Sequence, residues 1–270
     1  MKKIILSATL LLSILSGCAR ESEAEKLAKF NDEVNALTKD YQNKYQYFSS
    51  NPDMTPEQIA SSIDSLYNVT MPVYKDLCLS TLRNNRDNAV GVEALKVIAT
   101  DLEPNELQDA LSLLKGKAKE DKAIKAMQEY LDAVLSTAEG SMFRDFEVDG
   151  VKFSDFVGKG KYILVDFWAS WCGPCKQEIP YIADVYKKYN GEKFDVLSVA
   201  VWDKPEDTKK AASEHGVVWN QMINTQKVAA DLYGVVSIPQ IMLFGPDGTL
   251  LKRNLRGEEI EKAVKEALGR

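Results

Sequence analysis

Histidine and cysteine are scarce in this sequence, whose 270 residues include one histidine and four cysteines. A structural zinc site needs four such ligands, usually as two closely spaced pairs. Cys172 and Cys175 form one pair, but the remaining candidates, Cys18, Cys78 and His215, lie far apart along the chain. The sequence therefore argues against a zinc site, and we expect neither a metal nor another cofactor. Four cysteines are also too few for a fold stabilised mainly by disulfides.

Long hydrophobic runs are lacking as well. The uncharged run Ile4–Leu15 is too short to span a bilayer comfortably and follows a basic start, which predicts a signal peptide over residues 1–17. The run ends in Leu15-Ser-Gly-Cys18, which resembles the lipobox of bacterial lipoproteins. That resemblance implies that the signal is cut before Cys18 and that acyl chains on Cys18 anchor the protein in the cell envelope, facing the periplasm. An ordinary secretory signal with a chance cysteine is the alternative.

An excess of positive charge is also lacking. The sequence has 34 lysine and arginine residues against 40 aspartate and glutamate residues, and its formal net charge is −6. Removal of Lys2 and Lys3 with the signal changes the formal net charge from −6 to −8. Such an acidic protein has no electrostatic reason to bind nucleic acid. The location that the signal implies is one where disulfides form readily.

Two regions follow the signal. Residues 18–139 show helical periodicity nearly throughout and predict an all-α N-terminal domain. Thr55-Pro-Glu-Gln58 predicts one helix start, with a threonine cap and a proline in the first turn. The apolar stripes of this region predict a helical core and give no indication of its function.

The composition changes at about residue 140. Predicted strands and helices then alternate along the chain: Tyr162–Trp168, Lys176–Tyr189, Phe194–Val201, Glu206–His215, Ile241–Phe244 and Glu258–Leu268. This alternation predicts an α/β layer fold for residues 140–270.

The segment Trp171-Cys-Gly-Pro-Cys175 lies between a predicted strand and a predicted helix. This position places Cys172 at a helix N-terminus, where the helix dipole and unpaired N–H groups stabilise a thiolate. Thiolates carry out disulfide exchange, so the motif indicates a thiol–disulfide oxidoreductase. A purely structural disulfide is a weaker interpretation, because so short a loop restrains little unfolded-chain entropy.

Residues Phe146–Leu268 resemble the thioredoxin superfamily, and specifically its extracytoplasmic TlpA/ResA-like branch within the wider AhpC/TSA superfamily. The resemblance rests on Val165–Lys176, which contains Cys-Gly-Pro-Cys, and on Ile238-Pro239 before a predicted strand. It implies a thioredoxin-like fold over residues 140–270, with a central mixed sheet flanked by helices, preceded by the all-α domain. That helical half is similar to segments that precede such domains in lipoproteins of the Bacteroides group.

The resemblance also implies catalytic roles. Cys172 would be the exposed attacking cysteine and Cys175 the shielded resolving cysteine, and the two would form the redox-active disulfide. Burial should raise the pKa of Cys175, so this thiol needs a proton acceptor. Asp166 and Glu178 are the candidates, and the sequence leaves open which of them moves the proton. The alternatives are a solvated aspartate at a strand end and an exposed helix glutamate.

Substrate contacts follow from the same resemblance. Pro239 would follow a cis peptide bond, and the backbone of Ile238 would pair with the substrate chain. Trp171, Gly173 and Pro174 would complete the substrate-binding surface. An ordinary trans proline is the alternative.

The direction of electron flow is predicted from the Gly-Pro dipeptide between the cysteines. This is the thioredoxin dipeptide, and no histidine lies near it to stabilise the Cys172 thiolate further. We therefore expect a reductase of oxidised protein substrates, and the resemblance implies a membrane thiol-reducing protein as electron donor. A disulfide oxidase or isomerase and a partner-binding module with secondary redox activity are the alternatives. Peroxidase chemistry is disfavoured, because Val165 and Ala169 stand where peroxiredoxins have proline and threonine or serine.

Overall fold

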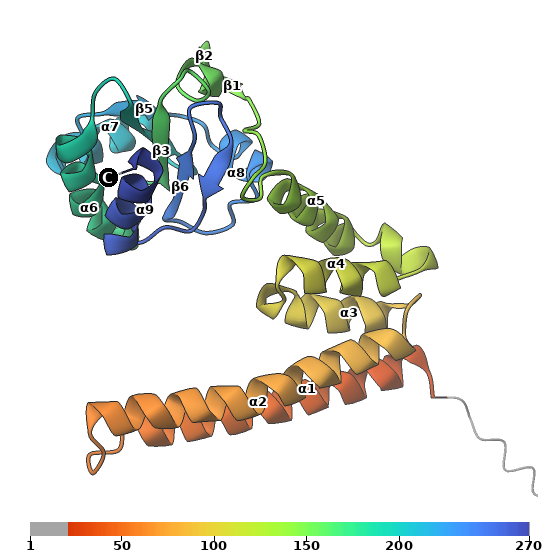
Figure 1. Ribbon diagram of the computed structural model, residues 1–270. Coiled ribbons are helices and arrows are strands. Elements are labelled where there is room, and N and C mark those ends of the chain that lie inside the picture. The colour runs from red at the N-terminus through yellow and green to blue at the C-terminus, as the bar shows by residue number, and fades with distance from the viewer. Residues whose placement is uncertain (1–20, 270) are drawn as a thin grey trace, which may run out of the picture. The chain divides into compact units, whose positions relative to one another are not determined.

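The computed structural model describes residues 21–269 (Figure 1). They divide into two compact units, one of residues 21–100 and 113–119 and the other of residues 101–112 and 120–269. Residue 139, the predicted end of the all-α domain, therefore lies inside the second unit. The prediction that residues 18–139 form a domain stays a prediction.

The first unit contains three α-helices: α1 (Glu23–Ser49), α2 (Pro56–Asn84) and α3 (Ala89–Ile98). Helices α1 and α2 lie side by side (Figure 1). Thr55 caps α2 in a capping box with Gln58, as the sequence predicts. Cys78 lies on α2 and is fully buried. Within residues 21–269, no helix has both the length and the apolar character that crossing a membrane requires.

The second unit begins with two helices, α4 (Pro104–Leu113) and α5 (Lys122–Ser136), and then contains the sheets. A small hairpin joins β1 (Glu147–Val148) to β2 (Val151–Lys152). The elements that follow are β3 (Tyr162–Trp168), α6 (Gly173–Tyr189), β4 (Phe194–Ala200), α7 (Pro205–Glu214), β5 (Asn220–Met222), α8 (Val228–Leu232), β6 (Gln240–Phe244), β7 (Leu250–Lys252) and α9 (Glu258–Leu268).

Helix α5 belongs to the same unit as the sheet, and the partly buried Arg253 forms hydrogen bonds with its C-terminal end. The guanidinium of Arg253 donates hydrogen bonds to the carbonyl and the hydroxyl of Thr137, each at 2.9 Å, and to the carbonyl of Tyr233. Through Arg253, these bonds join the C-cap residue of α5 to the C-cap residue of α8.

The main sheet has five strands in the order β5-β4-β3-β6-β7. Strand β3 is parallel to β4 and antiparallel to β6, while β5 is parallel to β4 and β7 is antiparallel to β6. One face packs on α6, α7 and α9, and the other on α8 and the segment around β1 and β2 (Figure 1). This mixed sheet flanked by helices confirms the predicted thioredoxin-like fold.

Strand β3 determines which side chains meet the active-site helix. Leu164 and Trp168 pack into the core shared with α6 and α9, whereas Val165 and Phe167 pack on the opposite face. Because successive side chains of a strand point to opposite faces, Asp166 lies on the α6 and α9 side.

Candidate active site

The two motif cysteines lie where β3 leads into α6, as predicted. Cys172 is the N-cap residue of α6, and its Sγ accepts a hydrogen bond of 3.1 Å from the backbone N–H of Cys175. The sulfurs of Cys172 and Cys175 are joined in a disulfide. This location gives the Cys172 sulfur both a backbone donor and the positive end of the helix dipole, which favour its thiolate once the disulfide is reduced.

The expectation that Cys172 is exposed is wrong for this disulfide state. Its residue exposure is 3%, and that of Cys175 is 1%. Cys172 is buried because its sulfur is bonded to Cys175 and directed at the first turn of α6 instead of at solvent. The predicted shielding of Cys175 is confirmed.

Asp166 is buried beneath this helix, with a residue exposure of 1%. The Ser198 hydroxyl donates a 3.4 Å hydrogen bond to Asp166 Oδ2, and Trp219 Nε1 donates to the Ser198 hydroxyl at 2.8 Å. Asp166 Oδ1 accepts no hydrogen bond from any described residue. The alternative of a solvated aspartate at a strand end is therefore wrong.

Burial raises the pKa of Asp166 from 3.8 to about 7. Desolvation is the largest cause; the negative charge of Glu178 also raises this pKa, whereas the Ser198 hydroxyl and the positive charge of Arg256 lower it. A carboxyl with a pKa close to neutral can both accept and release a proton under ordinary conditions.

Glu178 lies on α6, three residues after Cys175, and is partly buried. Its Oε2 accepts a hydrogen bond of 2.8 Å from the backbone N–H of Gly257, the N-cap residue of α9. The alternative of an unengaged glutamate on an exposed helix face is therefore wrong. Glu178 ties the active-site helix to the turn before α9.

The Ile238–Pro239 peptide bond is cis, as the resemblance implied. The sheet register sets Gln240, the next residue, opposite Phe167 near the carboxyl end of β3, where the cysteine loop begins. Ile238 packs against the core cluster that contains both cysteines. The structure thus brings this predicted substrate-binding segment to the cysteine end of the sheet.

The remaining predicted contacts are on the surface of the same turn. Trp171 has an exposure of 59%, and its Nε1 donates a 3.1 Å hydrogen bond to the carbonyl of Trp202. Gly173 and Pro174 are exposed in the first turn of α6.

Cys18 lies outside the described residues, so its lipidation stays a prediction.

Two residues at the site carry contacts that the sequence did not indicate. The buried carboxylate of Asp203 accepts hydrogen bonds from the N–H of Ser170 at 2.6 Å, the hydroxyl of Ser170 at 2.9 Å and the hydroxyl of Thr208 at 2.8 Å. It thereby fixes the loop that precedes Cys172. No local pattern in the sequence marks Ser170 or Thr208 as a partner of Asp203, so sequence reasoning did not find these contacts.

Arg256 is the second such residue. Its guanidinium donates to the carbonyl of Pro239 and, at 2.7 Å, to the carbonyl of Leu255. A single arginine before a glycine has no periodic or motif signal, so sequence reasoning had no means of finding it.

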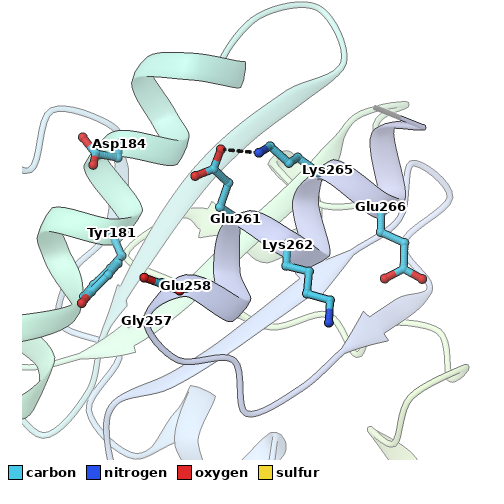
Figure 2. Close-up of a pocket in the computed structure, with 8 residues that line it drawn as sticks. All are labelled: Tyr181, Asp184, Gly257, Glu258, Glu261, Lys262, Lys265 and Glu266. Atoms are coloured by element: carbon cyan, nitrogen blue, oxygen red, sulfur yellow. Dashed lines mark ion pairs between the residues drawn. The ribbon is translucent and has the colours of Figure 1, made fainter.

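A charged hollow lies beside the turn that Glu178 binds. It has a volume of about 950 Å³, and Figure 2 shows it between α6 and α9. Glu261 on its wall pairs with Lys188 at 2.9 Å and with Lys265 at 3.2 Å, and these partners help to lower the pKa of Glu261 to about 2. Neither cysteine lines this hollow, so it is not the exchange site. The Glu261–Lys188 pair joins α9 to α6, whereas the Glu261–Lys265 pair lies within α9.

The sequence is similar to those of known thiol-disulfide oxidoreductases. The AhpC/TSA family matches residues 137–253. Thiol-disulfide oxidoreductase ResA of Bacillus subtilis (strain 168) is 30% identical over 122 residues, which are 43% of this chain and 67% of that protein. ResA of Geobacillus thermodenitrificans (strain NG80-2) is 29% identical over 136 residues, covering 50% of this chain and 76% of that protein.

Similar solved structures include the thioredoxin domain of a thiol-disulfide oxidoreductase from Bacteroides vulgatus. The two chains share 32% sequence identity, and the matched region covers 48% of this chain and 96% of that chain, with a TM-score of 0.43. A thiol:disulfide interchange protein from Bacteroides sp. shares 32% identity and covers 50% of this chain and 93% of that chain, with a TM-score of 0.45.

Proposed function

Since the chain belongs to the ResA-like thiol-disulfide oxidoreductases of the AhpC/TSA family, we propose that it reduces protein disulfides outside the cytoplasm and that acyl chains on Cys18 anchor it in the cell envelope. The observation that carries this proposal is the position of Cys172 as N-cap of α6, together with a buried aspartate on the face of β3 that packs on α6. A helix N-terminus stabilises the attacking thiolate, and the aspartate serves the second thiol.

In the first step, the reduced Cys172 thiolate attacks one sulfur of the substrate disulfide. The substrate S–S bond breaks, its other sulfur leaves as a thiolate, and Cys172 is held to the substrate in a mixed disulfide. We assign the backbone of Ile238 to hold the substrate chain, as the family resemblance implies, with Trp171, Gly173 and Pro174 beside it.

In the second step, Cys175 loses its proton and attacks the Cys172 sulfur. The mixed disulfide bond breaks, the substrate sulfur that was bonded to Cys172 leaves as a thiolate, and the protein is left with the Cys172–Cys175 disulfide of this structure. Two electrons have then passed to the substrate, so a membrane thiol-reducing donor must restore the dithiol before another cycle.

We assign the proton of Cys175 to Asp166. Its carboxyl is buried on the same side of the sheet as α6, and its pKa of about 7 suits proton exchange near neutral pH. Glu178 accepts a hydrogen bond from the Gly257 N–H, which supports a structural role in which it joins α6 to the turn before α9.

Cysteine variants test the proposed function. Cys172→Ser should abolish turnover of a model protein disulfide such as insulin, whereas Cys175→Ser should accumulate mixed disulfides that mass spectrometry locates at Cys172. Cys78→Ala is the matched control, because it removes a buried thiol on α2 and should leave turnover intact. Full turnover by Cys172→Ser would contradict the proposal, and survival of partner binding alone would favour the partner-binding alternative.

A further inference from the structure

The turn between β7 and α9, Leu255–Gly257, binds both halves of the proposed exchange site. On one side the N–H of Leu255 donates to the carbonyl of Ile241 at 3.1 Å, which aligns the turn with β6. On the other side the N–H of Gly257 donates to Glu178 on the active-site helix at 2.8 Å. The turn therefore lies between β6, which begins directly after Pro239, and the helix that carries Cys175.

Arg256, at the centre of this turn, reaches the residue that follows the proposed substrate-pairing position. Its two terminal nitrogens bind different carbonyls, those of Pro239 and Leu255. The guanidinium is planar, and its fork-shaped donors hold two acceptors in fixed directions. A hydrogen bond from a charged donor is also stronger than a neutral one. The Pro239 peptide is thus fixed to the turn, and through Gly257 to α6.

We propose that Arg256 is a positioning residue for disulfide exchange: its guanidinium fixes the Pro239 carbonyl to the turn that also binds Glu178, so that the substrate-pairing segment and the cysteine-bearing helix keep one relative arrangement. The inference rests on the proposed function, since it gives Ile238 and Pro239 the task of receiving substrate. Arg256 itself touches neither sulfur in this role.

The charge of Arg256 adds a second, separable consequence. The groups that act on Asp166 come from three elements: Ser198 on β4, Glu178 on α6 and Arg256 in the turn. Arg256 supplies the positive charge among them and lowers the pKa of Asp166. Without this charge, Asp166 stays protonated to a higher pH. Cysteine reactivity falls at low pH, and this falling part of its pH profile, the acidic limb, should move to higher pH.

Three variants of the full chain separate these effects. Arg256→Lys keeps the positive charge but loses the two-pronged donor, Arg256→Gln loses both, and Lys262→Gln removes one exposed positive charge from α9 as the matched control. KM and kcat are measured with insulin as substrate and dithiothreitol as electron source. The pH dependence of dithiol oxidation is measured separately with glutathione disulfide, and urea midpoints report on folding.

We expect KM to rise about tenfold in Arg256→Gln and severalfold in Arg256→Lys, with kcat changed less. The acidic limb should move upward in Arg256→Gln only. Lys262→Gln should change neither quantity. Wild-type KM in both Arg256 variants would overturn the proposal, as would equal acidic limbs in Arg256→Gln and Arg256→Lys.

These outcomes are distinct from a failure of the proposed function. If wild type reduces no insulin, the proposed function fails, whereas the glutathione reaction still reports whether Arg256 acts on the dithiol through Asp166. If Arg256→Gln does not fold, Arg256→Lys carries the test through its KM.

Discussion

Replacing Asp166 with asparagine should stabilise the sheet-containing unit by an amount that grows with pH. The pKa of Asp166 is raised from 3.8 to about 7 in the folded protein. Between these values the folded protein binds a proton that the unfolded chain has released, so the stability of wild type falls as pH rises through this range. Above pH 7 both states are ionised, and the loss is complete.

The size of the effect follows from the shift. About three units at roughly 1.36 kcal/mol per unit give a loss of about 4 kcal/mol at high pH. Roughly 2–3 kcal/mol of this loss lies between pH 5 and pH 8. The cost of burying an asparagine amide is independent of pH. It therefore cancels when the stability difference between variant and wild type at pH 5 is subtracted from that at pH 8.

Urea unfolding of the disulfide form, followed by tryptophan fluorescence, measures this difference. All four tryptophans, Trp168, Trp171, Trp202 and Trp219, lie in the second unit, so the signal reports on that unit. Asp207→Asn, on the exposed face of α7, is the matched control and should change stability by less than about 0.5 kcal/mol at both pH values. If Asp166→Asn changes stability equally at pH 5 and pH 8, the carboxyl is ionised at neutral pH and the reasoning is refuted.

Three further predictions address the rest of the site and the anchor. Asp203→Ala should destabilise the sheet-containing unit by about 2–4 kcal/mol in urea unfolding, because Ser170 and Thr208 lose a buried charged acceptor; a loss below about 0.5 kcal/mol contradicts this. Glu178→Gln keeps an acceptor for Gly257 but removes a negative charge that raises the pKa of Asp166, so the acidic limb of dithiol reactivity should move to lower pH; an upward move contradicts this. Cys18→Ser should transfer the protein from the membrane fraction to the soluble fraction, because it removes the acyl chains; unchanged membrane association contradicts the lipid anchor.

Local patterns predicted the elements that carry the chemistry. The apolar run Tyr162–Trp168 is strand β3 with the predicted bounds, and the helix after the cysteines ends at Tyr189 as predicted. Asp166, the candidate proton acceptor on this strand, is buried with its apolar neighbours. These predictions succeeded because each depends on residues close together in the sequence.

Contacts between distant segments were not predictable in the same way. The bonds of Asp203 to Ser170 and of Arg256 to Pro239 exist only once the sheet order brings separate loops to one end. Strand β5 has three residues and no alternating pattern, and its strand conformation comes from pairing with β4. The burial of Cys172 depends on the direction of its sulfur, which the sequence does not specify.

The equilibrium reduction potential of the Cys172–Cys175 pair tests the proposed direction most directly. It is measured in the soluble protein from Ala19 onward by titration against a thiol–disulfide buffer. The account predicts a value near that of thioredoxin, about −270 mV, as expected of a dithiol that works as a reductant. A value near about −120 mV would mean that the protein oxidises or isomerises disulfides, and would contradict the proposed reductase.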